Sequence, residues 1–135
     1  MNGSAMTLPF VDAHVHLWNL AGDIRYPWLT PPFGDGPAGP TRAIAVDYGL
    51  DEYLADAKGW DVRGMVHVDA GAEPADALKE TAWLQAMADA RGMPNAIIAF
   101  AALNDPRLEA LLAAHAAHPN VRGIRHIVGW HPDPV

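Results

Sequence analysis

Short apolar segments alternate with helix-like segments along the chain. The apolar segments predict four strands, at residues 9–16, 62–70, 95–103 and 121–128. Their apolar positions do not alternate cleanly, which is typical of strands buried on both faces of a parallel sheet. Between them, helices are predicted at residues 50–58, 73–91 and 105–118. This order predicts an α/β fold whose parallel strands are joined by right-handed crossovers.

One connection, residues 19–49, is long and has no regular pattern. It is rich in proline, but it contains Tyr26, Trp28, Phe33 and Tyr48, so it has aromatic side chains to pack with. Loops of this length in compact domains are usually functional or disordered. We interpret it as an ordered loop beside a site, with a disordered linker as the alternative. No domain boundary is evident, so residues 1–135 are expected to form a single domain.

Composition narrows the class of protein. The chain has 135 residues, half of them hydrophobic and 19% charged, which is a globular composition. The formal net charge of -7 disfavours nonspecific binding to nucleic acid or to an anionic membrane surface. The lack of cysteine excludes disulfides, iron–sulfur clusters and thiolate zinc sites. Neither a signal-peptide pattern nor a membrane-spanning run is recognisable, so a cytoplasmic location is expected.

The residues with the clearest chemistry end the first predicted strand, in the run DAHVHLW at residues 12–18. Side chains alternate along a strand, so His14 and His16 are expected to share one face, together with Asp12. Two imidazoles about 7 Å apart along a strand can bind one transition-metal ion. Asp12 is a candidate to hydrogen-bond a ligating imidazole and fix its tautomer. The alternatives are two structural histidines and a carboxylate that accepts backbone hydrogen bonds.

Further candidates follow the later strands. Arg125 is expected to bind a substrate carboxylate or carbonyl through its guanidinium, with a surface ion pair as the alternative. The sequence leaves open whether His126 or His131 reaches the site. Asp69 is a candidate pocket residue, whereas His67 is expected to be a core histidine.

Three aromatic residues are candidates for the wall of a substrate pocket. They are Trp18, which follows the histidine pair, and Tyr26 and Trp28 in the long loop. Aromatic rings bury large apolar areas anywhere in a protein, so packing within the loop is the alternative.

These motifs together resemble a known family. The chain resembles the amidohydrolase-related proteins of the amidohydrolase superfamily, which include sugar-lactone and 2-pyrone-4,6-dicarboxylate lactonases. The motifs that carry the resemblance are DAHVHLW at 12–18, YPWL at 26–29, VRGMV at 62–66 before Asp69, and VRGIRH at 121–126. The resemblance implies a TIM-like (β/α)8 barrel, often with a divalent metal of the zinc or manganese class and in some lactonases with none. The family's other site residues, a histidine and a late aspartate, follow in its second half. The chain therefore resembles an N-terminal half-barrel with four parallel strands.

The expected function is hydrolysis of a lactone or a related cyclic ester or amide, acting on a small-molecule substrate. His14 and His16 would hold the metal, and the general base is expected outside this chain. One alternative is a nonoxidative decarboxylase of the same superfamily. Another is a catalytically silent fragment or metal-binding module that needs a partner half. Open edges on the first and fourth strands also predict homo-oligomers.

Overall fold

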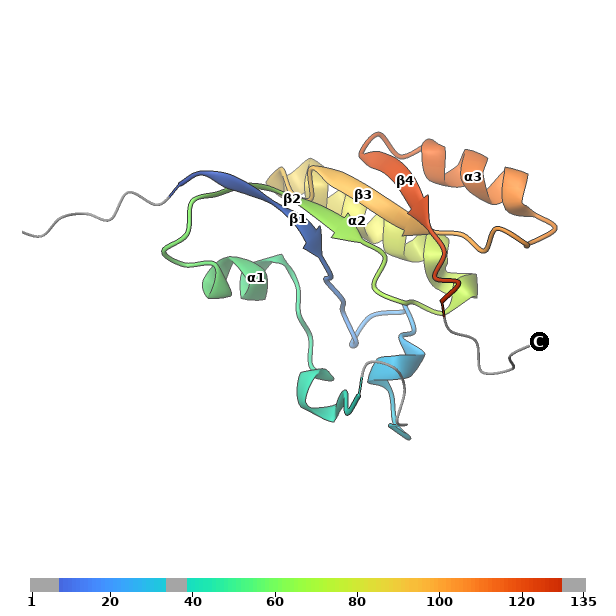
Figure 1. Cartoon of the computed structure of the whole chain (residues 1–135), viewed down its shortest axis with the longest axis horizontal. Helices are drawn as coiled ribbons and strands as arrows, with labels where there is room; N and C mark the ends of the chain where they lie inside the picture. The colour runs from blue at the N-terminus through green and yellow to red at the C-terminus, as the bar shows by residue number, and fades with distance from the viewer. Residues whose placement is uncertain (1–7, 34–38, 130–135) are drawn as a thin grey trace, which may run out of the picture.

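The computed structural model describes residues 8–33 and 39–129 and shows one sheet backed by helices (Figure 1). The sheet is parallel throughout, and its strands lie in chain order. The predicted α/β fold with four parallel strands is thus confirmed, in the arrangement of half a TIM barrel. The strands are β1 (Phe10–Val15), β2 (Val62–Val68), β3 (Ala96–Phe100) and β4 (Val121–Arg125).

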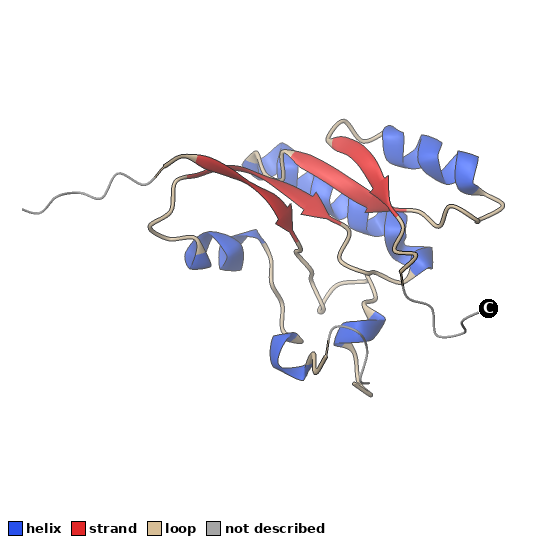
Figure 2. Ribbon diagram, in the orientation of Figure 1, coloured by secondary structure: helices blue, strands red, loops and turns tan. Residues whose placement is uncertain are grey.

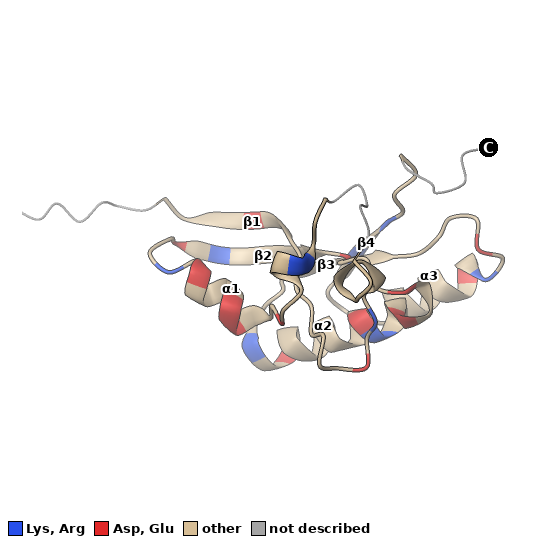
Figure 3. Cartoon of the chain, turned by 90° about the horizontal axis from the view of Figure 1, so that it is seen from below, with Lys and Arg blue, Asp and Glu red and all other residues tan. Residues whose placement is uncertain are grey.

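Helices cover one face of this sheet. Figure 3 shows α1, α2 and α3 together on one side, and no helix in the described ranges lies over the other side. None of the described helices is long and apolar enough to cross a membrane. The α-helices are α1 (Leu50–Asp56), α2 (Ala77–Arg91) and α3 (Leu108–Ala116), and the short 3-10 helices are η1 (Pro27–Leu29), η2 (Arg42–Ile44) and η3 (Pro74–Asp76) (Figure 2).

The core lies between the sheet and the helices. Met65 of β2 and Ile97 of β3 are fully buried, and Leu84 of α2 packs against the β3 side chains. Leu84 and Ala88 recur on α2 with the spacing of one helix face, which is why this face meets the sheet. Val11, which lies on the edge strand β1, remains 55% exposed. The chain thus buries the helix side of its sheet.

The described part of the long loop is packed. Tyr26 and Leu29 are buried together with Ala70, which follows β2. Trp18 and Tyr48 pair as an isolated antiparallel bridge, with backbone N–H···O distances of 2.9 and 3.1 Å. The loop therefore returns to the end of β1 before α1 begins, close to the ends of the strands.

Candidate functional site

The histidine pair converges at the C-terminal end of β1. The Nε2 atoms of His14 and His16 lie 3.1 Å apart, as their spacing along the strand predicts. The Nδ1 atom of His16 lies 2.8 Å from the carbonyl oxygen of Val68, so Nδ1 must carry the proton. The lone pair of His16 is then on Nε2 and faces His14. Burial, and after it the nearby Arg125 and His14, lowers the pKa of His16, which favours this neutral form.

This pair fits one side of a metal site. A zinc–nitrogen bond is about 2.0–2.1 Å long, so two nitrogens on one ion lie about 3.0–3.4 Å apart. The observed 3.1 Å falls in this range. Zinc sites use at least three protein ligands, and the described residues contain no group of three His, Asp or Glu that could hold a metal. The two imidazoles therefore form an incomplete ligand set.

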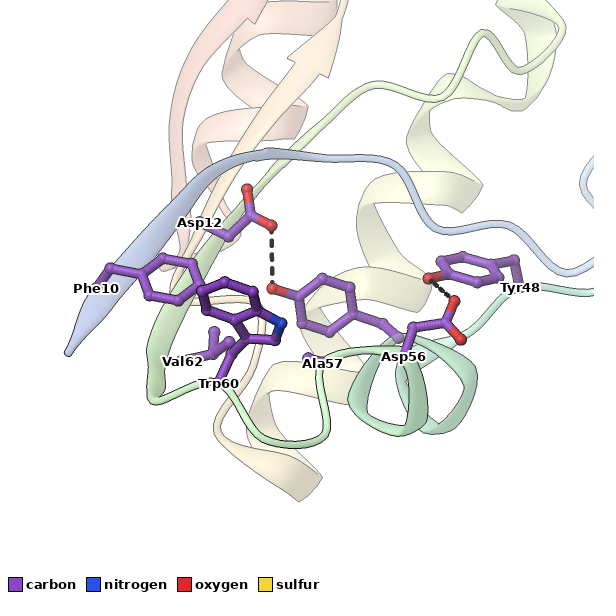
Figure 4. Close-up of a pocket in the computed structure, with 8 residues that line it drawn as sticks. Phe10, Asp12, Tyr48, Asp56, Ala57, Trp60 and Val62 are labelled. Carbon is purple, nitrogen blue, oxygen red and sulfur yellow. Dashed lines mark hydrogen bonds between the residues drawn. The ribbon is translucent and has the colours of Figure 1, made fainter. Parts of the chain in front are cut away.

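Asp12 does not lie beside the histidine rings, which corrects the expectation from strand alternation. The pairing of β1 with β2 shifts register between Asp12 and Val15, and such an irregularity changes which face the next side chains occupy. The Asp12 carboxylate accepts a hydrogen bond from the Tyr53 hydroxyl of α1 at 3.1 Å (Figure 4). It also accepts one from the backbone N–H of His14 at 3.3 Å. Asp12 thus connects β1 to α1 instead of orienting an imidazole.

The side of β1 that carries Asp12 borders an open groove of about 360 Å³. In Figure 4 the rings of Phe10 and Trp60 meet at one end, and Tyr48 donates a hydrogen bond to Asp56 at the other. The groove lies between β1 and α1, on the helix side of the sheet. It is therefore separate from the ring nitrogens at the end of β1.

Arg125 reaches from the end of β4 to the residue after β2. Its Nε donates to the Asp69 carboxylate at 2.5 Å, and its Nη2 donates to the Asp69 backbone carbonyl at 2.6 Å. The side chain of Asp69 is 5% exposed and that of Arg125 is 27% exposed, so this is a largely buried ion pair and not a surface one. The pair fixes the guanidinium near His16, and the guanidinium keeps further N–H groups for another ligand.

Two further candidates, His126 and His67, have structural partners. The Nδ1 atom of His126 accepts a hydrogen bond from the backbone N–H of Leu103 at 3.0 Å, so His126 supports the turn after β3. His67 is fully buried and hydrogen-bonded to the Leu17 carbonyl, and burial lowers its pKa to about 3. It is the neutral core histidine that the sequence predicts. His131 lies outside the described residues.

The three aromatic candidates belong to the packed loop. Trp18 and Tyr26 are 9% and 1% exposed, so they lie in the loop's own core and do not line an open wall. The reason is that burial of the rings stabilises a segment with little regular structure. Trp28 is only half-buried, and its indole N–H donates to the Ala70 carbonyl at 2.8 Å. Substrate contact stays a prediction for Trp28.

Sequence reasoning missed Glu80. This α2 side chain is 3% exposed, and its carboxyl accepts a long hydrogen bond from the Ala70 N–H at 3.3 Å. Burial raises the pKa of Glu80 to about 7, although the nearby Tyr26 hydroxyl and the Ala70 N–H act in the opposite direction. The sequence does contain a signal: Glu80 falls four residues before Leu84 on the buried face of α2.

Comparison with known proteins assigns the family. A family model described as amidohydrolase matches residues 11–135, nearly the whole chain. The chain belongs to the amidohydrolase family. This confirms the resemblance inferred from the motifs around His14, Tyr26 and Arg125.

One curated relative is considerably longer than this chain. Over 126 residues this amidohydrolase chain is 36% identical to "Uncharacterized protein y4mH" of Sinorhizobium fredii (strain NBRC 101917 / NGR234). The match covers 93% of the chain but 42% of y4mH, so the chain spans less than half of that relative's length. No solved structure gives a significant match.

Proposed function

We propose that this amidohydrolase chain supplies the metal-binding and substrate-orienting part of an active site that hydrolyses a lactone or a related cyclic ester or amide. The observation that carries the proposal is the convergence of His14 and His16 at the C-terminal end of β1. Barrel enzymes form their active sites at this end of the strands. Arg125 belongs to the same end, because it is the last residue of β4. The complete activity is proposed for a longer protein that contains this chain.

In this proposal the Nε2 atoms of His14 and His16 hold a divalent ion of the zinc or manganese class. Such an ion, when bound, activates water and polarises a carbonyl group. The hydrogen bond to Val68 fixes the His16 tautomer so that Nε2 stays available. Arg125 orients the carbonyl or carboxylate of a small-molecule substrate. In a metal-free variant, the two rings would polarise the substrate carbonyl directly, and in both variants the general base lies outside this chain.

The first test is metal binding by the chain itself. We expect weak zinc binding, with a dissociation constant above about 1 μM, because two imidazoles supply half of a tetrahedral shell. In isothermal titration calorimetry, His14→Ala and His16→Ala should each abolish the heat of binding. His118→Ala, two residues after the end of α3, is the matched control and should leave the heat of binding unchanged. Submicromolar binding that survives the first two substitutions would contradict the assignment.

The second test concerns the substrate. In a longer protein that contains this chain, Arg125→Ala should lower kcat/KM for lactone hydrolysis by about 10- to 150-fold, the effect of losing a charge-assisted hydrogen bond. Arg122→Ala removes an exposed arginine of the same strand and serves as the control. An unchanged kcat/KM in the Arg125 variant would remove Arg125 from the site. Release of carbon dioxide without ring opening would favour the decarboxylase alternative.

The alternative of a fragment that needs a partner half rests on the sheet edges. Within the described ranges, β1 and β4 each have one neighbouring strand, and Val11 on β1 is exposed. Unprotected apolar edges recruit other strands. We therefore expect the chain to self-associate as its concentration rises in light scattering, and Val11→Lys to weaken this association. Val46→Lys, at a loop position that is 62% exposed, should have no such effect. A chain that stays monomeric at all concentrations would oppose this alternative.

A further inference from the structure

We propose that Glu80 is a positioning residue, which acts through the turn after β2 to set both the Arg125–Asp69 pair and the long loop. The inference deepens the proposed function, because it rests on Arg125 as the substrate-orienting residue. Glu80 itself is buried and is not expected to touch substrate.

Two consecutive residues of this turn connect the three elements. The Ala70 N–H donates to both carboxyl oxygens of Glu80, at 3.3 and 3.4 Å, and the Ala70 carbonyl accepts the Trp28 indole N–H at 2.8 Å. The preceding residue, Asp69, receives Arg125 through its carboxylate and its backbone carbonyl. A displacement of this peptide unit therefore moves the contacts of α2, the long loop and β4 together.

The next residue shows how closely the loop approaches the turn. Gly71 has a φ of 73°, a conformation that side chains of L residues rarely adopt. A Cβ atom at this position would lie 2.9 Å from the Trp28 indole nitrogen. The loop thus sits directly on the turn, and small changes in the turn must change the environment of Trp28.

The charged and polar groups around Glu80 couple its protonation state to the Arg125–Asp69 pair and to the long loop. The groups that act on it are the Tyr26 hydroxyl from the loop, the Asp69 carboxylate after β2 and the Arg125 guanidinium from β4. The Tyr26 hydroxyl is buried, and in the described structure it has no hydrogen-bond partner of regular geometry. An ionised Glu80 would be repelled by the Asp69 carboxylate and attracted to the Arg125 guanidinium. It could also accept a hydrogen bond from the Tyr26 hydroxyl. A neutral Glu80 leaves Asp69 as the sole carboxylate partner in this network for Arg125.

The test follows two side-chain N–H groups by 15N–1H NMR of the whole chain. Trp28→Phe and Arg125→Lys identify the Trp28 indole and Arg125 Nε resonances. From about pH 5.5 to about pH 8.5, both resonances should shift with one common midpoint near neutral pH, where a buried carboxyl of this kind titrates. Glu80→Gln should abolish the common shift, and Glu109→Gln, on the exposed face of α3, should preserve it.

Three results would overturn the proposal: separate midpoints for the two resonances, no shift in the wild-type chain, or a common shift that persists in Glu80→Gln. The last result would assign the titration to histidines, which the variant retains. If Glu80→Gln does not fold, His14→Ala and His16→Ala separate the two sources: a common shift that persists in both variants supports Glu80, and one that disappears overturns the proposal. The readout needs neither metal nor substrate, so a failure of the proposed hydrolysis would leave this result intact and would be recognised separately.

Discussion

Asp69→Ala is expected to lower the free energy of unfolding by about 3 kcal/mol or more, the cost of removing one partner from a buried ion pair. The Asp69 side chain is 5% exposed. Arg125 donates one hydrogen bond to the Asp69 carboxylate and a second to the Asp69 backbone carbonyl. Its loss leaves a guanidinium that is only 27% exposed without a counter-charge. Urea denaturation at neutral pH, followed by circular dichroism, measures the change.

The control for this substitution is Asp61→Ala, which removes a surface pair with Arg63. The side chains of Arg63 and Asp61 are 67% and 30% exposed, although their closest N···O distance is also 2.5 Å. Exposed pairs contribute about 0–1 kcal/mol, since water screens them. The short contact is therefore common to both pairs, and burial differs. Equal losses in the two variants would show that the Asp69–Arg125 pair is not a buried structural link.

The second large effect is a dependence of stability on pH through Glu80. Burial raises the pKa of this carboxyl from 4.5 to about 7. Between these pH values the folded chain holds a proton that the unfolded chain has released, so raising the pH favours unfolding. The stabilising contribution of the Glu80 proton is complete below about pH 4.5, declines as pH rises and is lost above about pH 7. At about 1.36 kcal/mol per pKa unit, the total is on the order of 3 kcal/mol.

His67 acts in the opposite direction, so Glu80 must be isolated by comparison. Burial lowers the pKa of His67 to about 3, which means that acid stabilises the unfolded chain relative to the folded one as pH falls below about 6.5. The difference between wild-type and Glu80→Gln unfolding free energies cancels this effect. That difference should change by about 3 kcal/mol between pH 4.5 and pH 7. For the control variant Glu109→Gln, the difference from the wild-type unfolding free energy should not change with pH. A pH-independent difference for Glu80→Gln would refute the buried, proton-holding state of Glu80.

The two predictions bear on one part of the molecule, the turn after β2. Asp69 precedes this turn, Ala70 forms it and Glu80 lies beneath it on α2. If both hold, the position of Arg125 depends on its ion pair with Asp69 and on the buried acid Glu80. The position of Arg125 would then be set by the core of the half-barrel as well as by the side chains at the ends of its strands.

The sequence by itself determined the elements, the fold class and the family. Apolar segments of strand length, separated by helix-like segments of which two have proline near the first turn, were sufficient because such patterns are local properties of the chain. The convergence of His14 and His16 was also predictable, since two residues on one side of a strand end are brought together by backbone geometry alone. The DAHVHLW, YPWL and VRGIRH motifs led to the amidohydrolase family, which the family match confirms.

Only the tertiary structure decided which polar groups meet. The register shift between Asp12 and Val15 arises from pairing with β2, and it separates Asp12 from the histidine rings. The contact of Arg125 with Asp69 joins residues 56 positions apart, so no local pattern contains it. Glu80 could be placed on the buried face of α2 by its spacing, but its raised pKa depends on what covers that face. Strand pairing and burial are properties of the folded chain, and the protonation and orientation of the candidate site follow from them.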